Sequence, residues 1–187
     1  MSEAKRALRA ELRHRRAGRD PDQLAEWGDL LAAHAAALPG RTLTGFAGTG
    51  GEVPTLPLLD ALVADGRRVL LPVTLDDMTL DWADYTGPGD LAPARLGLLE
   101  PTGPRLGPAA IAAAEAILVP ALAVDRAGRR LGQGGGCYDR ALPHATGRVI
   151  AVVADDEVLD AVPTEPHDLP VDAVLTPTGG LVDVPRG

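Results

Sequence analysis

The stretch Arg129-Arg130-Leu131-Gly132-Gln133-Gly134-Gly135-Gly136-Cys137-Tyr138-Asp139-Arg140 sets four glycines inside a frame of arginines and one aspartate. Glycine has no Cβ, so such a run can take positive φ and let backbone N–H groups converge on an anion, helped by the dipole of a helix starting near Tyr138. Arg129 and Arg130 could balance a phosphate charge, and Asp139 could hold a metal ion. The stretch therefore predicts an anion-binding loop. A flexible surface turn is the alternative, but Leu131 and Tyr138 are apolar anchors that pure linkers rarely carry.

Length and composition predict one domain spanning residues 1–187. The chain has 187 residues, of which 45% are hydrophobic, enough to bury one core. A single cysteine excludes an internal disulfide, and no apolar run is long enough for a membrane span or a signal peptide. We expect a soluble cytoplasmic protein with no membrane partner.

Charge is unevenly divided along the chain. Residues 1–19 carry seven Lys or Arg and two Glu, a balance of +5, which leaves −13 for the remainder because the net charge is −8. A chain that is so acidic overall would repel nucleic acid, so we expect no nucleic-acid partner. The basic amino-terminal segment is better suited to a small anion.

Two stripes indicate that this basic segment is a helix. Apolar residues recur every four positions (Ala4, Leu8, Leu12), and basic residues recur at intervals of four, four and three (Lys5, Arg9, Arg13, Arg16). Like charges at this spacing destabilise an isolated helix by a few tenths of a kcal/mol per pair, which a bound polyanion would relieve. The alternative is a solvated basic face.

The rest of the chain alternates between helical and strand patterns. Asp20 and Pro21 form a typical helix start, and Pro39-Gly40 a stop. The patterns predict helices over 21–38, 54–64, 109–114 and 136–145, strands over 41–47, 67–73, 79–85, 117–119 and 149–153, and a long Gly/Pro-rich loop over 87–108 that borders the site. We predict an α/β fold: a single-domain three-layer sandwich with a mostly parallel sheet and an N-terminal helical pair. The glycine-rich loops 45–51 and 128–136 should then emerge at the carboxyl ends of the strands, where such sheets bind ligands.

Several familiar sites are excluded. The glycine-rich stretch lacks the Lys-Ser/Thr of a Walker A loop, and Gly45 to Gly51 misses the dinucleotide-binding spacing. Ser2 is the only serine and is terminal, so a serine nucleophile is excluded. Cys137 is better suited to packing than to nucleophilic attack, and His167-Asp168 to a turn than to a catalytic base. No enzyme nucleophile is therefore predicted.

The segment PALAVDRAGRRLGQGGGCYDR, residues 120–140, resembles the signature of 5-formyltetrahydrofolate cyclo-ligases, also called methenyltetrahydrofolate synthetases. Further matching pieces fall in family order along the chain: Lys5-Arg6-Ala7-Leu8-Arg9, Glu52-Val53-Pro54-Thr55, Gly97-Leu98-Leu99-Glu100-Pro101, Pro166-His167-Asp168 and Val171-Asp172-Ala173-Val174. The resemblance implies a ligase that uses ATP and Mg²⁺ to close 5-formyltetrahydrofolate to 5,10-methenyltetrahydrofolate, with release of ADP and phosphate.

The resemblance also implies roles for individual residues. Lys5 and Arg130 would be catalytic, through contacts to the transferring phosphate. ATP would be bound by Lys5, Arg6, Ala7, Leu8 and Arg9, and by Arg130, Leu131, Gly132, Gln133, Gly134, Gly135, Gly136, Cys137 and Tyr138. Asp139 and Asp172 would hold Mg²⁺, and Glu52 would bind the folate. The partners would be folate and ATP alone, with the protein a monomer or a weak homodimer.

Three positions depart from the family pattern. Cys137 stands where relatives usually have an aromatic residue, Leu96 where Phe or Trp is expected, and Val73 where many relatives carry Arg. These departures leave open a diverged ATP- or folate-binding relative that acts on another acid or amide. A sugar-phosphate isomerase-like enzyme is a further alternative, but it would need neither ATP nor the paired acids Asp139 and Asp172.

Overall fold

The computed structural model describes residues 2–165 and 168–185 and centres on a seven-stranded sheet. The strand order is β12-β11-β9-β6-β1-β2-β3, and only the edge strands β12 and β3 run antiparallel to their neighbours. The strands are β1 (Thr42–Thr44), β2 (Arg68–Thr74), β3 (Leu80–Tyr85), β6 (Ala116–Pro120), β9 (Arg148–Val152), β11 (Ala173–Thr176) and β12 (Gly180–Asp183). The predicted mostly parallel sheet is confirmed.

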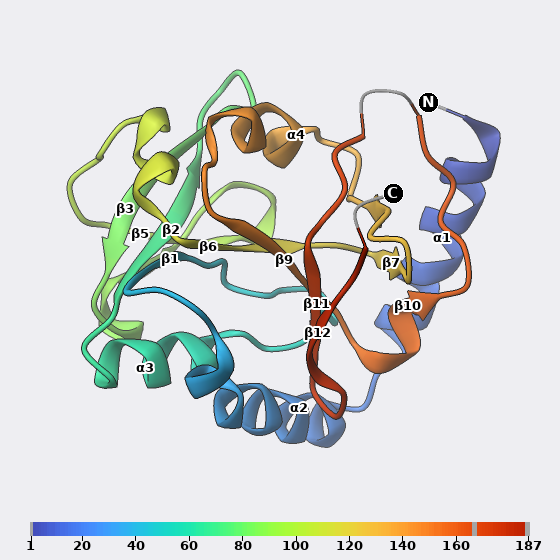
Figure 1. Cartoon of the computed structure of the whole chain (residues 1–187), viewed down its shortest axis with the longest axis horizontal. Helices are drawn as coiled ribbons and strands as arrows, with labels where there is room; N and C mark the ends of the chain where they lie inside the picture. Colours follow the sequence, from blue (N-terminus) through green and yellow to red (C-terminus); the bar gives the residue numbers. More distant parts are fainter. Residues whose placement is uncertain (1, 166–167, 186–187) are drawn as a thin grey trace.

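Helices cover both faces of this sheet, which confirms the three-layer sandwich (Figure 1). On one face lie α2 (Pro21–Ala33) and α3 (Leu56–Ala64), whose Leu31, Leu58 and Leu59 are fully buried. The other face carries α4 (Cys137–Ala141) and two 3₁₀ helices, Pro108–Ala113 and Leu142–His144. The helix α1 (Glu3–Ala17) lies at the side of the sandwich, beside β7 and β10.

Both N-terminal helices begin at a side-chain cap, of which the sequence predicted the second, Asp20. Ser2 Oγ accepts the backbone N–H of Lys5 at 3.3 Å, and Asp20 Oδ1 accepts that of Asp22 at 3.0 Å. The predicted end of α2 at residue 38 is wrong, because the helix stops at Ala33 and a 3₁₀ turn, Ala35–Ala37, follows. Leu38 is extended because Pro39 disfavours helical φ/ψ in the residue before it, and it buries its side chain in the core.

The predicted βαβ unit is present. β1 and β2 pair in parallel, with Thr42 opposite Arg68 and Thr44 opposite Leu70, and α3 connects them across one face. β1 is shorter than predicted, because the chain leaves the sheet after Gly45 to form the loop that leads to α3. The predicted helix over 136–145 is divided into α4 and the 3₁₀ turn Leu142–His144, as Pro143 removes a backbone donor.

Besides β11 and β12, which the predicted strand ranges do not include, three smaller features are absent from the sequence prediction. Residues 87–108 contain a hairpin of β4 (Leu91–Pro93) and β5 (Leu99–Pro101), which follows the 3₁₀ turn Pro88–Asp90 and whose strands are connected by the 3₁₀ turn Arg95–Gly97. A second sheet, in the order β10-β7-β8, joins Val158–Leu159, Ala123–Asp125 and Arg130–Leu131. A last 3₁₀ turn covers Asp155–Glu157. None of the helices in the described ranges is long and apolar enough to cross a bilayer.

Leu59 provides a test of the core between α3 and the sheet. Its side chain is fully buried, and a Cβ added to Gly45 would lie only 2.5 Å from its Cδ2 atom. We expect Leu59→Ala to lower the free energy of unfolding by about 2–5 kcal/mol in urea denaturation, through lost burial and a cavity. Val182→Ala is the control, because Val182 is 53% exposed on β12 and should cost less than about 0.5 kcal/mol. Equal effects of the two substitutions would contradict this packing.

Candidate functional site

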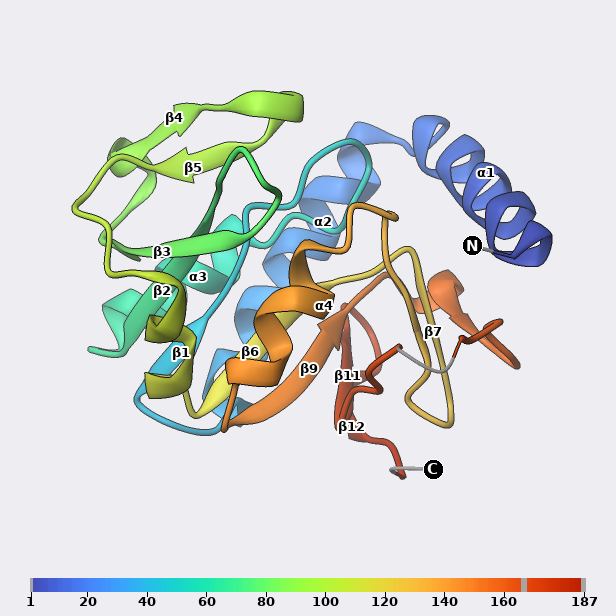
Figure 2. The ribbon, with the colours of Figure 1, turned by 90° about the horizontal axis from the view of Figure 1, so that it is seen from above.

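A cavity of about 920 Å³ opens at the carboxyl ends of β1, β2 and β6. Its walls are formed by the loops that follow β1 and β8, by one side of α1, and by the tip of the β4–β5 hairpin. Figure 2 shows α1 and this hairpin at the two ends of one edge of the molecule, with the loop after β1 between them. Both glycine-rich loops thus reach the cavity, as the sequence predicted.

One end of the cavity is rich in cations. Four of them come from α1, and the others belong to the glycine-rich segment and α4; they are Lys5, Arg9, Arg13, Arg16, Arg130 and Arg140. The basic stripe of α1 therefore faces the cavity. At its two ends it is not a solvated face, because Lys5 is only 3% exposed and Arg16 only 4%, while Arg9 is half-buried and Arg13 exposed.

The buried Lys5 is compensated by acids from a distant segment. Its Nζ lies 3.1 Å from Glu165 Oε2 and 2.5 Å from Asp168 Oδ2. The hydrogen bond and charge of Lys5 lower the pKa of Glu165 to about 2, so this carboxylate stays ionised at neutral pH. The acids hold the ammonium at the cavity wall. Pro166 and His167 lie between them, outside the described residues.

Two arginines tie α1 to the glycine-rich loop. Arg9 Nε donates to the carbonyl of Gly132 at 2.8 Å, and Arg13 Nη2 donates to the carbonyl of Gln133 at 2.6 Å. Gly134 and Gly136 have φ of 104° and 70°, so the loop needs glycine at these two positions. With the carbonyls turned toward α1, none of the backbone N–H groups of residues 132–136 donates to an acceptor in the described part of the chain. These donors are available to an anion.

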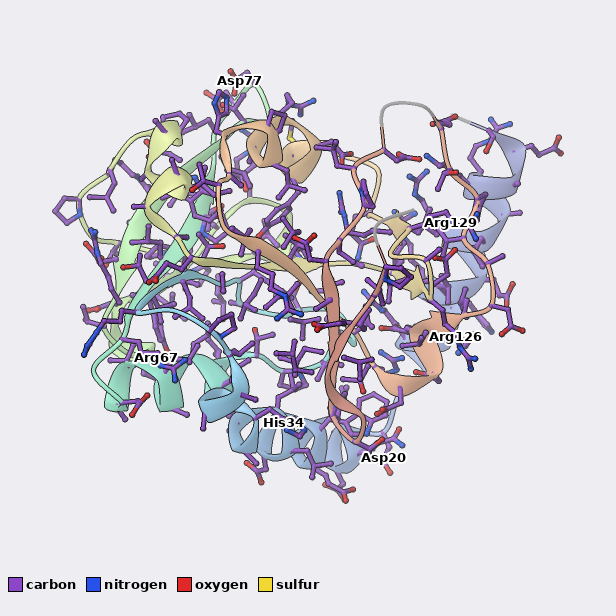
Figure 3. The ribbon with its side chains drawn as sticks, in the orientation of Figure 1. Asp20, His34, Arg67, Asp77, Arg126 and Arg129 are labelled. Atoms are coloured by element: carbon purple, nitrogen blue, oxygen red, sulfur yellow. The ribbon has the colours of Figure 1, made fainter. Side chains whose placement is uncertain are left out.

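Arg130 and Asp139 meet at the wall of the cavity. Arg130 Nη2 lies 2.5 Å from Asp139 Oδ1, and Arg130 Nε is buried without a partner among the described residues. Arg129 was predicted to share its role, but this is wrong: its guanidinium pairs with Asp125 at the end of β7, and it does not line the cavity. Figure 3 labels Arg129 in this position, and Asp77 at the far tip of the β2–β3 turn.

Arg16 holds Glu52 in the cavity wall. Its Nη1 lies 3.2 Å from Glu52 Oε1, while its Nε donates to Glu157 at 2.6 Å and its Nη2 to the carbonyl of Ala121. Burial lowers the pKa of Arg16, but Glu157 and Glu52 outweigh it and raise the pKa above the ordinary value. The guanidinium therefore stays charged. The sequence grouped Arg16 with the anion-binding stripe, whereas the structure uses it to position a carboxylate.

The opposite end of the cavity is apolar. Its wall is formed by side chains from the loop after β1, from β2 and β3, and from the hairpin: Phe46, Pro72, Leu80, Leu98 and Leu99. Residues 87–108 therefore border the site, as predicted. The side chain of Leu96 is not among those that the structure describes. Val73 is buried and does not line the cavity, so its departure from the family pattern does not alter the wall.

Cys137 and Tyr138 stand between the two ends. Both line the cavity; burial raises the pKa of the Cys137 thiol, which disfavours a nucleophilic thiolate. The hydroxyl of Tyr138 is buried without a partner in the described part of the chain, and burial, with the charge of Glu52, raises its pKa above the ordinary value. Both side chains are un-ionised at neutral pH.

Some predicted site residues do not reach the cavity. Asp172 precedes β11 and accepts the backbone N–H of Val149 at 2.9 Å, at the amino-terminal edge of the sheet. It is not brought together with Asp139, and no cluster of three potential metal-ligating side chains occurs in the described ranges. Arg6 and Ala7 are exposed outside the cavity, while Leu8 and Leu131 pack in the small cluster under α1.

The comparisons with known proteins agree with this geometry. The model of the 5-formyltetrahydrofolate cyclo-ligase family matches residues 1–177. The chain belongs to this family. It is 50% identical over 152 residues to the 5-formyltetrahydrofolate cyclo-ligase of Mycolicibacterium smegmatis, covering 78% of each chain, and 31% identical over 176 residues to that of Escherichia coli K12, covering 89% of this chain and 97% of the relative.

Solved structures of cyclo-ligase relatives share the fold. The 5,10-methenyltetrahydrofolate synthetase of Aquifex aeolicus superposes with a TM-score of 0.81 at 26% identity, covering 98% of this chain and 94% of that one. The synthetase of Mycoplasma pneumoniae gives a TM-score of 0.71 at 18% identity, covering 91% and 96%, and at this identity it supports the fold alone.

The buried Arg16–Glu157 pair predicts a large stability effect. Glu157 is 1% exposed, so Glu157→Ala leaves the Arg16 guanidinium buried without its main partner. We expect the free energy of unfolding in urea to fall by about 3–5 kcal/mol. Asp156→Ala is the matched control, since that carboxylate is 48% exposed between Arg15 and Arg19, and Arg19 keeps Glu157 and the Gly51 carbonyl as partners; it should cost less than about 1 kcal/mol. A loss below about 1 kcal/mol for Glu157→Ala would show that the pair is dispensable.

Proposed function

We propose that this chain cyclises 5-formyltetrahydrofolate to 5,10-methenyltetrahydrofolate, with ATP converted to ADP and phosphate. One observation carries the proposal: in a chain of the cyclo-ligase family, a helix that carries the buried cations Lys5 and Arg16 faces a glycine-rich loop at one end of a cavity whose other end is apolar. The cationic end suits a polyphosphate and the apolar end suits a flat heterocycle.

The reaction does not need an enzyme nucleophile. The oxygen of a formamide is a poor leaving group, so the γ-phosphoryl group of ATP is transferred to it and ADP departs. The second folate nitrogen then attacks the activated carbon, its proton is lost, and the formyl oxygen leaves as part of phosphate. Catalysis by positioning and charge stabilisation is consistent with the protonated thiol of Cys137.

The residues divide between the two substrates. Lys5, Arg9 and Arg130 would contact the ATP phosphates, together with the N–H groups of loop 132–136. Lys5 and Arg130 would stabilise the charge that develops on the transferred phosphoryl group. Glu52 would accept hydrogen bonds from the folate, since Arg16 and the backbone N–H of Thr49 fix its carboxylate in the wall.

The Mg²⁺ ion would have one protein carboxylate, that of Asp139. Mg²⁺ in nucleotide sites keeps several waters and binds through one or two carboxylates plus substrate phosphates, so one carboxylate at the cavity wall fits this ion. Asp172 does not fit, because it caps Val149 away from the cavity. When bound, the ion supplies positive charge that neutralises the phosphate oxygens.

We also propose that residues 1–187 act as one domain, in the cytoplasm, as a monomer or weak homodimer. The central sheet combines strands from the first half of the chain, such as β1, with strands from its end, such as β12, which supports a single unit. The net charge of −8 supports a small-molecule enzyme without a nucleic-acid partner.

The direct test of the reaction is the near-ultraviolet absorbance of the methenyl product. Purified protein mixed with 5-formyltetrahydrofolate, ATP and Mg²⁺ should give a rising absorbance, and omission of ATP should abolish it. ATP binding without product would favour the diverged relative that acts on another acid or amide.

Lys5→Ala and Arg130→Ala should each weaken transition-state binding by on the order of 2–4 kcal/mol, a fall in kcat/KM of roughly 30- to 1000-fold. Arg6→Ala is the control, because Arg6 is exposed one residue from Lys5 and outside the cavity. Since Lys5 is buried, each variant should first show a native melting transition. Wild-type turnover in the folded Lys5→Ala variant would show that Lys5 does not contact the ATP phosphates.

Asp139→Asn should raise the Mg²⁺ concentration needed for half-maximal rate, because the amide loses the negative charge that attracts the ion. The measurement is a Mg²⁺ titration of the initial rate at saturating ATP. Asp172→Asn serves as the comparison and should leave the titration curve unchanged. The reverse pattern would reinstate Asp172 as the ligand.

A further inference from the structure

Glu100 places a carboxylate at the apolar end of the cavity. It lies on β5, is half-buried, and lines the cavity beside Leu98 and Leu99 of the same hairpin. Leu80 of β3, which is opposite Thr74 of β2, closes the wall on the other side. Burying a charged group in such surroundings costs free energy unless hydrogen bonds compensate it, so the partners of each carboxylate oxygen decide whether Glu100 is stable there.

The first partner follows from the sheet topology. The pairing of β1 with β2 ends at Thr44 opposite Leu70, and the last bond between them runs from the Gly45 N–H to the Leu70 carbonyl at 2.8 Å. Four residues further along β2, the N–H of Thr74 points to the side on which β1 has already ended, so no strand carbonyl accepts it there. It donates to Glu100 Oε1 at 2.9 Å. Glu100 therefore caps an orphan strand donor, which accounts for one of its two oxygens.

The second oxygen of Glu100, Oε2, has no such donor. Glu100 Oε2 makes no hydrogen bond or ion pair with any residue of the described ranges, and it is not among the polar atoms that are buried without a partner. This oxygen is therefore accessible, on a side chain that lines the cavity. Glu52 differs, because its Oε1 receives Arg16 and its Oε2 receives the Thr49 N–H at 3.0 Å. Of these two cavity carboxylates, only Glu100 has an oxygen without a hydrogen-bond donor among the described residues.

We propose that Glu100 recognises the paired N–H donors of the substrate's aminopyrimidinone ring and fixes the orientation of the heterocycle. An ionised carboxylate only accepts hydrogen bonds, so it matches a ring edge on which an exocyclic amino group adjoins a ring N–H. The adenine of ATP does not offer this edge, because ring acceptors flank its amino group. This inference rests on the proposed function and assigns the folate ring to the apolar end.

Glu100→Gln separates recognition from capping. The amide keeps one oxygen for the Thr74 N–H, so a purely structural role predicts unchanged kinetics. If Glu100 also binds paired donors, then whichever way the amide turns, one of its own N–H groups meets a donor. We expect the Kd for 5-formyltetrahydrofolate, from calorimetric titration, to rise about 10- to 100-fold, with the KM for ATP changed less than about twofold.

Two comparisons make this test specific. Glu115→Gln is the matched control, because Glu115 Oε2 caps the backbone N–H groups of Arg41 and Thr42 outside the cavity, at 2.6 and 3.2 Å. It should leave both affinities unchanged. A folate analogue that lacks the exocyclic amino group should bind wild-type protein more weakly, and should lose less affinity on Glu100→Gln than the parent folate does.

The outcomes distinguish the two proposals. An equal loss for the folate and its analogue, no loss for either, or a loss confined to ATP would overturn the role of Glu100. Absence of methenyl product with wild-type protein would overturn the proposed function instead. The calorimetric titration would still decide whether Glu100 binds the ring, because it does not depend on turnover.

Discussion

The attachment of α1 to the glycine-rich loop is the constraint on which the site depends. Lys5 and Arg16 are buried cations on one helix, and each must find acceptors in a medium of low polarity. Glu165 and Asp168 pair with Lys5, while Glu157 and Glu52 pair with Arg16. Three of these four acids lie more than 100 residues away along the chain, and Glu52 lies 36 residues away, so distant segments must assemble against α1. Arg9 and Arg13 bind carbonyls of the loop, whose own N–H groups have no acceptor among the described residues.

The two ends of the cavity have opposite polarity, and this separates the proposed substrates. Phosphates would occupy the cationic end, between α1 and the loop after β8. The heterocycle would occupy the apolar end, under the β4–β5 hairpin. Between them lie Tyr138 and Cys137, both protonated at neutral pH. Such an arrangement lets the chain bring two substrates into contact without forming a covalent bond to either.

The sequence predicted those elements that carry a strong local signal. The basic and apolar stripes of α1, the Asp20-Pro21 start of α2, and the apolar runs of β2, β6 and β9 all lie where expected. The β7–β8–β10 sheet and the hairpin were missed because strands of two or three residues are too short to show a period. Pairing with distant strands, rather than local preference, stabilises them.

By itself, the sequence determined the mostly parallel three-layer fold, the family, and the two glycine-rich loops at the carboxyl ends of the strands. Only the tertiary structure decided which charged residues meet. In the structure, Arg129 pairs with Asp125 and Arg16 with Glu52, and Asp172 accepts a hydrogen bond from the backbone N–H of Val149. The tertiary structure also left one oxygen of Glu100 accessible in an apolar wall. The reason is physical: a charged side chain is fixed by the partners that folding brings within hydrogen-bond distance. Local sequence does not specify which of these it meets, even where the partner is as near as Asp125 is to Arg129.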